Sequence, residues 1–592
     1  MLDAAPVALQ HPRTMQISDF ATLRARRPLL LALGVAMLAC AFWNGPLAED
    51  SSAGCLFTAS VLGGMVLLAV ALSGRLAFGL IAGCLPMLLL EAAANLKFKY
   101  LVTPLLAPDL LYYFNQQILD TLLHYPLLIG AIVLALILVP LLLTVAWRGE
   151  RKPAARWRTR LARVAGVAMG IAVLGISMNP DGPFAAVHAK GMWLAMNDDS
   201  LVSDFLISFR STRVIAPRYN LADASRFDWR DDNADVETAG QPRPDIVAVL
   251  EESTFDPRML AVCTLPTVCD HRMFHADANT LAHGWLEVHT WGGGTWTTEF
   301  AFLTGLAHDL FGPAGIYAPF NLAPRIRYTL PHVLHDNGYR TVAIYPTDGD
   351  FLNGRNAYAH YGFDAFYGGE QVGLGWHSTD ADLMRVFQHV FAIEKAKAHG
   401  RPVFLFMLTL HQHGPHMTPL SQLPAPYNRP LFTGKAAPDK VLDEWLNLNL
   451  SNYLQRLAMS DAAEADLENQ LRADDRPALL LHFGDHQPSF DGAITALPKR
   501  LPALISNPQV VTYYMLKGFG MKSPSRYDYP VLDIAYAGSL LLDAAGLRKD
   551  AFFTANALLR ERCHGQYLDC RDTDVLHSYR ADVFGPLHDL AD

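Results

Sequence analysis

Five long apolar stretches in the first third of the chain decide more about its fold than any other feature. They cover roughly residues 28–43, 54–73, 76–94, 126–147 and 160–178. Each is close to the ~20 residues that a helix needs to cross the hydrocarbon core of a bilayer. They also explain why 51% of the 592 residues are hydrophobic, which is high for a soluble protein. The sequence therefore predicts an N-terminal α-helical membrane domain of about five transmembrane helices over residues 1–180.

Loop charges predict the orientation of these helices, because positively charged loops stay in the cytoplasm. Seven basic residues lie around the start of the last stretch: Arg148, Arg151, Lys152, Arg156, Arg158, Arg160 and Arg163. The N-terminus is also basic, and no small-residue cleavage site follows the first stretch, which favours a retained anchor. Five spans then place everything after about residue 180 outside. If the fifth stretch, with its charged start and three glycines, does not insert, the rest lies in the cytoplasm instead.

The cysteines favour an oxidising compartment for the large C-terminal part. Four of the seven form two close pairs, Cys263/Cys269 and Cys563/Cys570, and the other three lie in or beside the apolar stretches. Two short-range pairs predict two small disulfide loops. The net charge of −9, with no basic patch in this part, argues against nucleic acid as a partner.

Beyond the membrane domain we expect a linker over residues 181–243, followed by an alternation of strands and helices. Six short apolar runs are predicted to be strands: Ile246–Leu250, Trp285–His289, Thr341–Tyr345, Val403–Thr409, Leu479–Phe483 and Val510–Leu516. Near-continuous apolar strands separated by helices are typical of a mostly parallel sheet covered on both faces. This α/β domain is expected over residues 244–560, with a C-terminal tail, 561–592, that contains the second cysteine pair.

Acidic residues and a histidine follow two of the predicted strands. Asp485 and His486 come directly after the strand that ends at Phe483, and Glu251 and Glu252 come after the first strand. A carboxylate beside an imidazole suits a catalytic divalent cation, and ligands of parallel sheets bind beyond the carboxyl ends of the strands. Either glutamate could complete the site, because periodicity cannot separate neighbours in a strand that is buried on both faces.

A run of three glycines, residues 292–294, precedes Thr295 and a predicted helix. Glycines let the backbone approach a ligand closely, and the start of a helix favours an anion such as phosphate. Thr295 is a candidate nucleophile, although a threonine hydroxyl is weak until a cation or a base lowers its pKa. Thr297 and Thr298 are alternatives for that role or for capping the helix.

Two further residues are candidates for binding an anionic substrate. His413 belongs to a loop with His411 and His416, and one of these three histidines is a candidate phosphate or metal contact. Arg355 could form paired hydrogen bonds with a phosphate. A surface role for Arg355 is equally compatible with the sequence.

In this order the motifs resemble those of the lipoteichoic acid synthase and periplasmic glucan phosphoglycerol transferase branch of the alkaline phosphatase (sulfatase-like) superfamily. The matching residues are Glu252-Ser253, Gly294-Thr295 with Glu299-Phe300, Arg355 with Tyr358, Thr409-Leu410 with His413 and Pro415, and Gly484-Asp485-His486. The chain departs from the family pattern by one residue in the Arg355–Tyr358 spacing and by Trp296 in place of a small polar residue. The segment from Cys263 to Thr267 does not match a formylglycine motif, which argues against sulfate-ester hydrolysis.

The resemblance implies a sulfatase-like domain after the membrane domain. It implies the metal ligands Glu252, Thr295, Asp485 and His486, the nucleophile Thr295, and the substrate-binding residues His413 and Arg355. The expected reaction moves the phosphoglycerol headgroup of phosphatidylglycerol, through a covalent intermediate on Thr295, onto a periplasmic glucan or similar glycan. The expected location is the bacterial inner membrane, with the catalytic domain in the periplasm.

The expected cofactor is a divalent cation, Mn²⁺ first, with Mg²⁺ or Zn²⁺ as alternatives, because the ligands are oxygens and nitrogen without thiolate. Two other functions stay open. One is a phosphoethanolamine transferase of the same superfamily, and the other is a non-catalytic sensor or assembly protein that keeps the fold. Four intact ligands argue against the second of these.

Overall fold

The computed structural model describes residues 27–101, 105–112, 126–150, 157–188, 200–209, 214–230, 242–490, 492–522, 524–567 and 569–591. The chain divides into two compact units. The first consists of Met1–Lys97, Pro104–Ala107 and Ile118–Phe209, and the second of Phe98–Thr103, Pro108–Gln117 and Arg210–Asp592.

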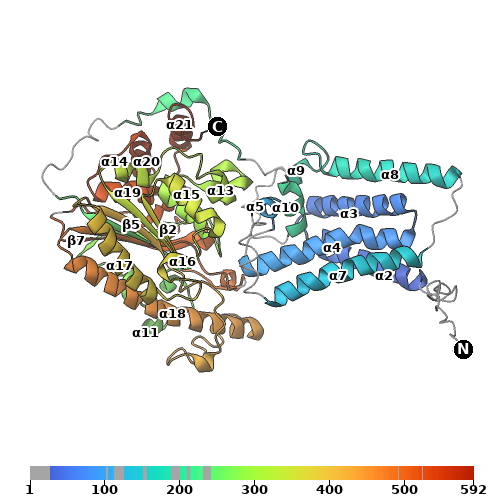
Figure 1. Ribbon diagram of the computed structural model, residues 1–592, viewed down its shortest axis with the longest axis horizontal. Helices are drawn as coiled ribbons and strands as arrows, with labels where there is room; N and C mark the ends of the chain where they lie inside the picture. Colours follow the sequence, from blue (N-terminus) through green and yellow to red (C-terminus); the bar gives the residue numbers. More distant parts are fainter. Residues whose placement is uncertain are drawn as a thin grey trace, which may run out of the picture. The chain divides into compact units, whose positions relative to one another are not determined.

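The first unit contains five long apolar helices (Figure 1). They are α2 (Arg27–Asn44), α3 (Ser52–Ser73), α4 (Leu76–Leu101), α7 (Pro126–Gly149) and α8 (Trp157–Ser177). Each contains a stretch long and apolar enough to cross a membrane. The predicted helical membrane domain is therefore confirmed by length and composition. Shorter helices are α5 (Asp109–Tyr112), which belongs to the second unit, and α9 (Ala185–His188) and α10 (Leu201–Ser208) within the predicted linker.

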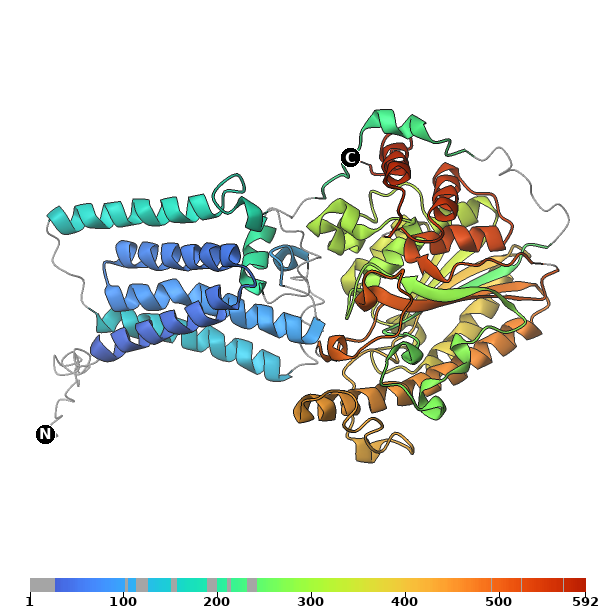
Figure 2. The same ribbon diagram turned by 180° about the vertical axis from the view of Figure 1, so that it is seen from behind.

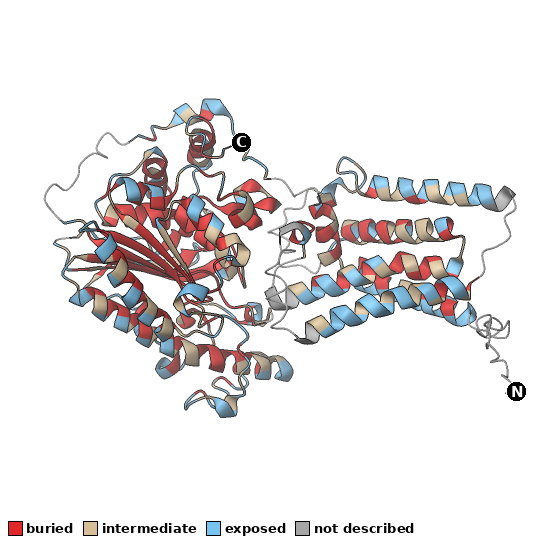
Figure 3. Cartoon of the chain, in the orientation of Figure 1, coloured by how far each residue is buried: buried red, intermediate tan, exposed pale blue. Residues whose placement is uncertain are grey.

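Two glycines allow α3 and α4 to pack closely. Gly79 and Gly83, four residues apart on α4, face Val70 and Val66 of α3, and a Cβ on either glycine would lie 2.5 Å from the valine Cα. Small residues at this spacing let membrane helices approach each other. Helix α7 is exposed along much of its length (Figure 3). Its exposed side chains include large apolar ones such as Leu136, with 69% of its area accessible. Apolar outer surfaces of this kind mark contact with a membrane.

The second unit is built around one eight-stranded sheet. Its strands are β1 (Asp245–Glu251), β2 (Thr280–Glu287), β3 (Arg340–Tyr345), β4 (Ala365–Gly368), β5 (Val403–Leu408), β6 (Ala478–Gly484), β7 (Val511–Phe519) and β8 (Val531–Asp533). They are ordered β4-β3-β5-β1-β6-β7-β2-β8 across the sheet. Figure 2 shows the second unit, with helices on either side of the sheet. All neighbours are parallel except the two pairs that β7 makes with β6 and β2. The predicted mostly parallel sheet is confirmed, with β4 and β8 as additional short strands.

Helices cover both faces of the sheet. They are α11 (Pro266–Cys269), α12 (Thr295–Thr304), α13 (Ala318–Asn321), α14 (Leu330–Asp336), α15 (Gly354–Tyr361), α16 (Gly369–Val372), α17 (Asp380–Lys397), α18 (Lys440–Ala473), α19 (Ala537–Ala544), α20 (Ala551–Arg562) and α21 (Thr573–Phe584). On one face, Phe387 of α17 and Leu467 of α18 share a core with Val249 of β1. On the other, the Phe302 ring of α12 lies 5.0 Å from the ring of Phe483 in β6. Burial on both faces explains why the central strands are apolar at nearly every position.

Both predicted disulfides are present, Cys263–Cys269 and Cys563–Cys570. Helix α20 continues across the predicted boundary at residue 560, and α21 packs against the chain that leads into the sheet. Trp229 Nε1 donates a hydrogen bond to Ser578 Oγ of α21 over 3.1 Å. The C-terminal segment therefore packs as part of the second unit.

Candidate metal and nucleophile site

Four predicted site residues lie together at the carboxyl edge of the sheet. Glu252 follows β1, Thr295 begins α12 shortly after β2, and Asp485 and His486 follow β6. Thr295 Oγ1 lies 3.1 Å from Glu252 Oε2 and 3.4 Å from His486 Nε2. The two acids and the histidine each offer a ligand atom within 4.8 Å of the others, and all three are buried. The sheet thus assembles two carboxylates, one imidazole and one hydroxyl, which we call the Thr295 cluster.

A strained backbone at Ser253 fixes the two carboxylates. Its φ of 49° is left-handed, which costs a non-glycine residue about 1–3 kcal/mol. In this conformation Ser253 N donates to Asp485 Oδ1 over 2.6 Å, and Ser253 Oγ donates to Glu252 Oε1 over 2.7 Å. His486 N donates to the same Asp485 oxygen over 2.7 Å. These hydrogen bonds therefore fix one oxygen of each carboxylate, and the other oxygen of each carboxylate points into the cluster.

The unsatisfied atoms of the cluster fit a divalent cation. Asp485 Oδ2 is buried, has no hydrogen-bond partner among the described residues and lies 3.2 Å from His486 Nε2. His486 Nδ1 donates to Gln487 O over 3.0 Å, and since a carbonyl only accepts, the lone pair of Nε2 faces the carboxylates. Burial lowers the pKa of His486, which keeps the ring neutral. Neutral imidazole and carboxylate are the forms that bind metals.

The two carboxylates have opposite pKa shifts. Burial raises the pKa of Asp485 well above its usual value, and the negative charge of Glu252 adds to the effect. Burial acts in the same direction on Glu252, but the charge of His486 and His413 when they are protonated, together with hydrogen bonds from Ser253 and Thr295, outweighs it and lowers its pKa. Two negative charges repel each other strongly in a buried site, so both carboxylates are not readily ionised together. A cation between them would offset this repulsion.

The three threonines at the start of α12 differ in their hydrogen bonds. Thr297 Oγ1 donates to Gly294 O over 2.7 Å, and Thr298 Oγ1 donates to Asp485 O over 2.8 Å. Both side chains are buried and are satisfied by backbone carbonyls. The half-buried Thr295 instead donates to a carboxylate, so of the three it is the one whose hydroxyl lies in the cluster.

Gly294 places Thr295 at the first position of the helix. Its φ is 85°, and a Cβ here would lie 2.9 Å from Thr290 Oγ1, so the turn requires glycine. The first N–H groups of a helix have no partner within the helix and favour an anion. The hydroxyl of Thr295 and an anion-binding helix start therefore lie side by side.

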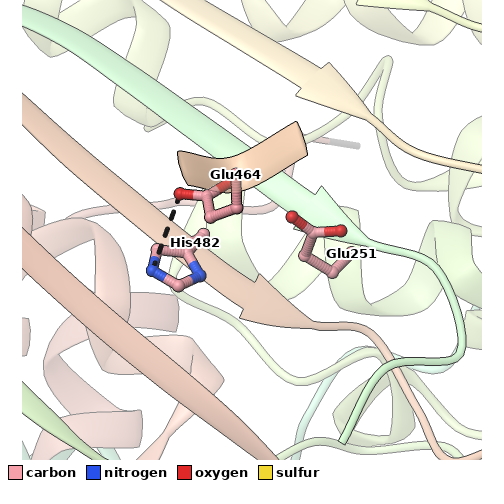
Figure 4. A group of neighbouring side chains, drawn as sticks. All are labelled: Glu251, Glu464 and His482. Carbon is pink, nitrogen blue, oxygen red and sulfur yellow. Dashed lines mark ion pairs between the residues drawn. The ribbon is translucent and has the colours of Figure 1, made fainter. Parts of the chain in front are cut away.

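Glu251 and Glu252, which the sequence could not separate, point to opposite sides of the sheet. Glu252 is in the Thr295 cluster, whereas Glu251 offers a ligand atom within 4.8 Å of Glu464 and His482 (Figure 4). Successive residues of a strand alternate between faces, and Glu251 continues the face of β1 that packs against α18. The assignment of Glu252 as the metal ligand stays a prediction that this geometry favours.

His413 lies in the exposed loop after β5, close enough for its charge to act on Glu252. Its Nδ1 donates to Gly414 O over 2.8 Å, which leaves Nε2 for a ligand. Its ring lies 5.2 Å from that of Trp376 in an edge-to-face contact. Arg456 of α18 holds the loop by donating to His413 O over 2.9 Å. The loop is therefore fixed from two sides.

Arg355 begins α15 and is already paired. Its Nη2 lies 2.5 Å from Glu370 Oε1 and its Nε lies 3.3 Å from Asp350 Oδ1. Among the described residues, none of its hydrogen bonds or ion pairs is with the Thr295 cluster. A guanidinium has five N–H groups, and these two pairs use those of Nε and Nη2, so a phosphate can bind at Nη1 without displacing either carboxylate.

Two residues that hold the site in place, Trp376 and Arg456, were not predicted, and Glu299 was named only as part of a motif, without a role. Glu299 is buried in α12 and accepts a hydrogen bond from Tyr358 Oη over 2.7 Å, and burial raises its pKa to about 7. The contacts of Arg456 depend on the packing of a distant helix, so no local signal reveals them. Trp376, a half-buried tryptophan that directly follows the glycines at 373 and 375, is the one that a search for ligand-facing aromatics could have found.

The sulfatase family model matches residues 244–519, which include every residue of the Thr295 cluster. Residues 244–519 form a sulfatase-family domain. The chain is 28% identical over 366 residues to an uncharacterized protein of Haemophilus influenzae, covering 60% of this chain and 63% of that protein. It is 26% identical over 428 residues to a Rhizobium meliloti protein named for a proposed role in cyclic β-1,2-glucan modification, covering 66% and 60%. The chain thus spans less than two thirds of the length of these curated relatives.

Several solved structures resemble the sulfatase-family domain or more of the chain. The phosphoglycerol transferase GacH of Streptococcus pyogenes gives a TM-score of 0.48 at 15% identity, covering 63% of this chain and 95% of that one. The phosphoethanolamine transferase EptA of Neisseria meningitidis gives 0.47 at 12% identity, covering 88% and 98%. At these identities and TM-scores the likenesses do not bear on the activity of this chain.

Proposed function

We propose that the chain is a membrane-bound, metal-dependent phosphoglycerol transferase that moves the headgroup of phosphatidylglycerol onto a periplasmic glucan or similar glycan. The observation that carries the proposal is the hydroxyl of Thr295, 3.1 Å from Glu252 Oε2 and beside Asp485 and His486. A module that only binds its ligand needs no such hydroxyl. The sulfatase-family domain supports phosphate-group chemistry, and the Rhizobium relative supports a glucan acceptor.

In the first step of the proposed reaction, Thr295 Oγ attacks phosphorus and the bond from phosphorus to the diacylglycerol oxygen breaks. The threonine proton is released to water and the leaving oxygen takes a proton from water, because Glu252 is a proposed metal ligand with a lowered pKa. A phosphoglyceryl-threonine results. An acceptor hydroxyl then attacks phosphorus and releases its proton to water, the bond from phosphorus to Thr295 Oγ breaks, and this oxygen takes a proton from water.

A divalent cation, with Mn²⁺ our first expectation, would be held by Glu252, Thr295, Asp485 and His486, where it would lower the pKa of the hydroxyl and neutralise phosphate charge. The N–H groups at the start of α12 stabilise the phosphate oxygens in the same place. We assign His413 and Arg355, which uses Nε and Nη2 for its carboxylate pairs, to the phosphoglycerol group. Two steps suit a membrane-bound donor and a water-soluble acceptor, because the two need not be bound together.

The donor is tested with the full-length chain in vesicles of either phosphatidylglycerol or phosphatidylethanolamine, by measuring released diacylglycerol. We expect release from phosphatidylglycerol only. Release from phosphatidylethanolamine alone would make the chain a phosphoethanolamine transferase. No release from either lipid, with metal and a glucan present, would favour a non-catalytic protein that keeps the fold.

We also propose that the sulfatase-family domain lies in the periplasm. Positive charge concentrated in residues 148–163 favours a cytoplasmic loop before α8, and the two disulfides favour an oxidising compartment for the domain. A phosphatase reporter that is active only outside the cytoplasm should be active when fused after residue 592 and inactive when fused within 148–160. The reverse pattern would contradict the proposed location.

A further inference from the structure

A second group of metal-ligating side chains lies behind the Thr295 cluster, on the face of the sheet that α18 covers. Glu251 at the end of β1, His482 in β6 and Glu464 in α18 each offer a ligand atom within 4.8 Å of the other two. All three side chains are buried. Figure 4 shows the carboxylate of Glu464 facing the ring of His482 from its helix, with Glu251 on the neighbouring strand. Three elements far apart in sequence therefore bring these groups together.

The atoms at the centre of this group are unsatisfied. Glu251 Oε2, both carboxylate oxygens of Glu464 and His482 Nε2 are buried without a hydrogen-bond partner among the described residues. His482 Nε2 lies 3.7 Å from Glu464 Oε1, which is too long for a hydrogen bond. Buried polar atoms in native proteins almost always have a partner, so four in one place point to a bound group.

The carboxylates of Glu251 and Glu464 also lack a lysine or arginine partner among the described residues, whereas the neighbouring carboxylate of Glu468 has such partners. Glu468, one turn after Glu464, pairs with Lys517 and with Arg272, each over 2.8 Å. Within the described part of the chain, Glu464 has no lysine or arginine at ion-pair distance, and neither has Glu251. Buried acids are rarely left without a cation, because desolvation of an unpaired charge is costly.

The spacing of the ligand atoms suits a transition metal. Ligands bind Zn²⁺ at about 2.0–2.2 Å, so two of them around one ion are separated by roughly 3–4 Å, as His482 Nε2 and Glu464 Oε1 are. His482 Nδ1 lies 3.0 Å from Tyr513 Oη. If Nδ1 donates to that hydroxyl, the lone pair of Nε2 faces the carboxylates, as in metal-bound histidines whose other nitrogen is hydrogen-bonded.

We propose that Glu251, Glu464 and His482 bind a second divalent transition-metal ion, with Zn²⁺ as the cation to test. The ion would have a structural role, because it would join α18 to the carboxyl ends of β1 and β6, the two strands that supply Glu252, Asp485 and His486. The proposal does not depend on the identity of the donor lipid or of the acceptor.

The test counts metal ions in the full-length chain, purified in detergent, stripped with chelator, reloaded with Zn²⁺ alone and measured by elemental mass spectrometry. We expect about two ions per chain in the wild type, about one in Glu464→Gln, about one in Asp485→Asn, and none in the double variant. Asp466→Asn changes an exposed acid two residues from Glu464 on the same helix and should keep both ions. X-ray absorption at the zinc edge of Asp485→Asn should show one imidazole with oxygen ligands and no sulfur.

The Asp485→Asn variant tests the second site without altering it, so the proposal stays testable if Glu464→Gln does not fold. The proposal would be overturned if the wild type bound only one ion and the Asp485→Asn variant bound none. Two ions in Glu464→Gln would overturn it as well. Failure of the lipid assay would leave both counts unchanged, which keeps this proposal separable from the proposed function.

Discussion

Replacement of Thr295 by alanine is expected to abolish headgroup transfer while leaving the protein folded and able to bind metal. The reason is that Thr295 is the threonine of α12 whose hydroxyl donates to a carboxylate of the cluster rather than to a backbone carbonyl. Loss of a general acid–base group alone costs ~10²–10⁴-fold in rate, and loss of the nucleophile should cost at least as much. The rate of diacylglycerol release from phosphatidylglycerol vesicles measures the effect.

The neighbouring threonines provide matched controls for this variant. Thr297→Ala and Thr298→Ala each remove one buried hydrogen bond to a carbonyl, which should reduce stability by about 1 kcal/mol and retain transfer. Thr295→Ser keeps a hydroxyl in place and should retain part of the activity. Transfer that survives in Thr295→Ala but is lost in one of the other two would mean that the nucleophile is a different threonine.

Removal of the metal is expected to have a comparable effect. Asp485 Oδ2 is a buried oxygen without a hydrogen-bond partner among the described residues, and it faces His486 Nε2. Asp485→Asn keeps the shape of the side chain but removes its charge, so it should weaken metal binding and lower transfer by ~10²-fold or more. Exhaustive chelation of the wild type should abolish transfer, and addition of Mn²⁺ should restore it.

Elemental analysis of the chelated protein is the control, because it shows whether the chelator has removed all of the metal. Transfer that persists in a sample with no measurable metal would remove the basis for the metal-dependent mechanism. Restoration by Zn²⁺ or Mg²⁺ but not by Mn²⁺ would correct the identity of the cation and keep the mechanism.

The membrane helices and the central strands could be predicted from the sequence because their apolar character is local. The stretch 126–147, for instance, differs little from helix α7, and the predicted strand at 246–250 lies inside β1. The reversed direction of β7 was not predictable in this way, because a strand buried on both faces has the same composition whether it runs parallel or antiparallel to its neighbours.

In the site, too, residues could be predicted where the local sequence determines their position, and could not where their position depends on distant elements. Asp485 and His486 could be placed because residues that follow parallel strands meet at one edge of the sheet. The choice between Glu251 and Glu252 could not be made, since it depends on which face is covered by α12 and which by α18. Arg355 pairs with Asp350, five residues before it, and with Glu370 of α16. The second pairing depends on the fold and has no signature around residue 355.

The central claim, a covalent intermediate on Thr295, is tested most directly by intact-mass measurement of the full-length chain. The protein is incubated with phosphatidylglycerol and metal but without acceptor, then digested to locate any adduct. We predict the mass of one phosphoglycerol group on the peptide that contains Thr295, absent in Thr295→Ala and lost when a glucan acceptor is added. Diacylglycerol release without any adduct, or an adduct that persists in Thr295→Ala, would contradict the proposed mechanism.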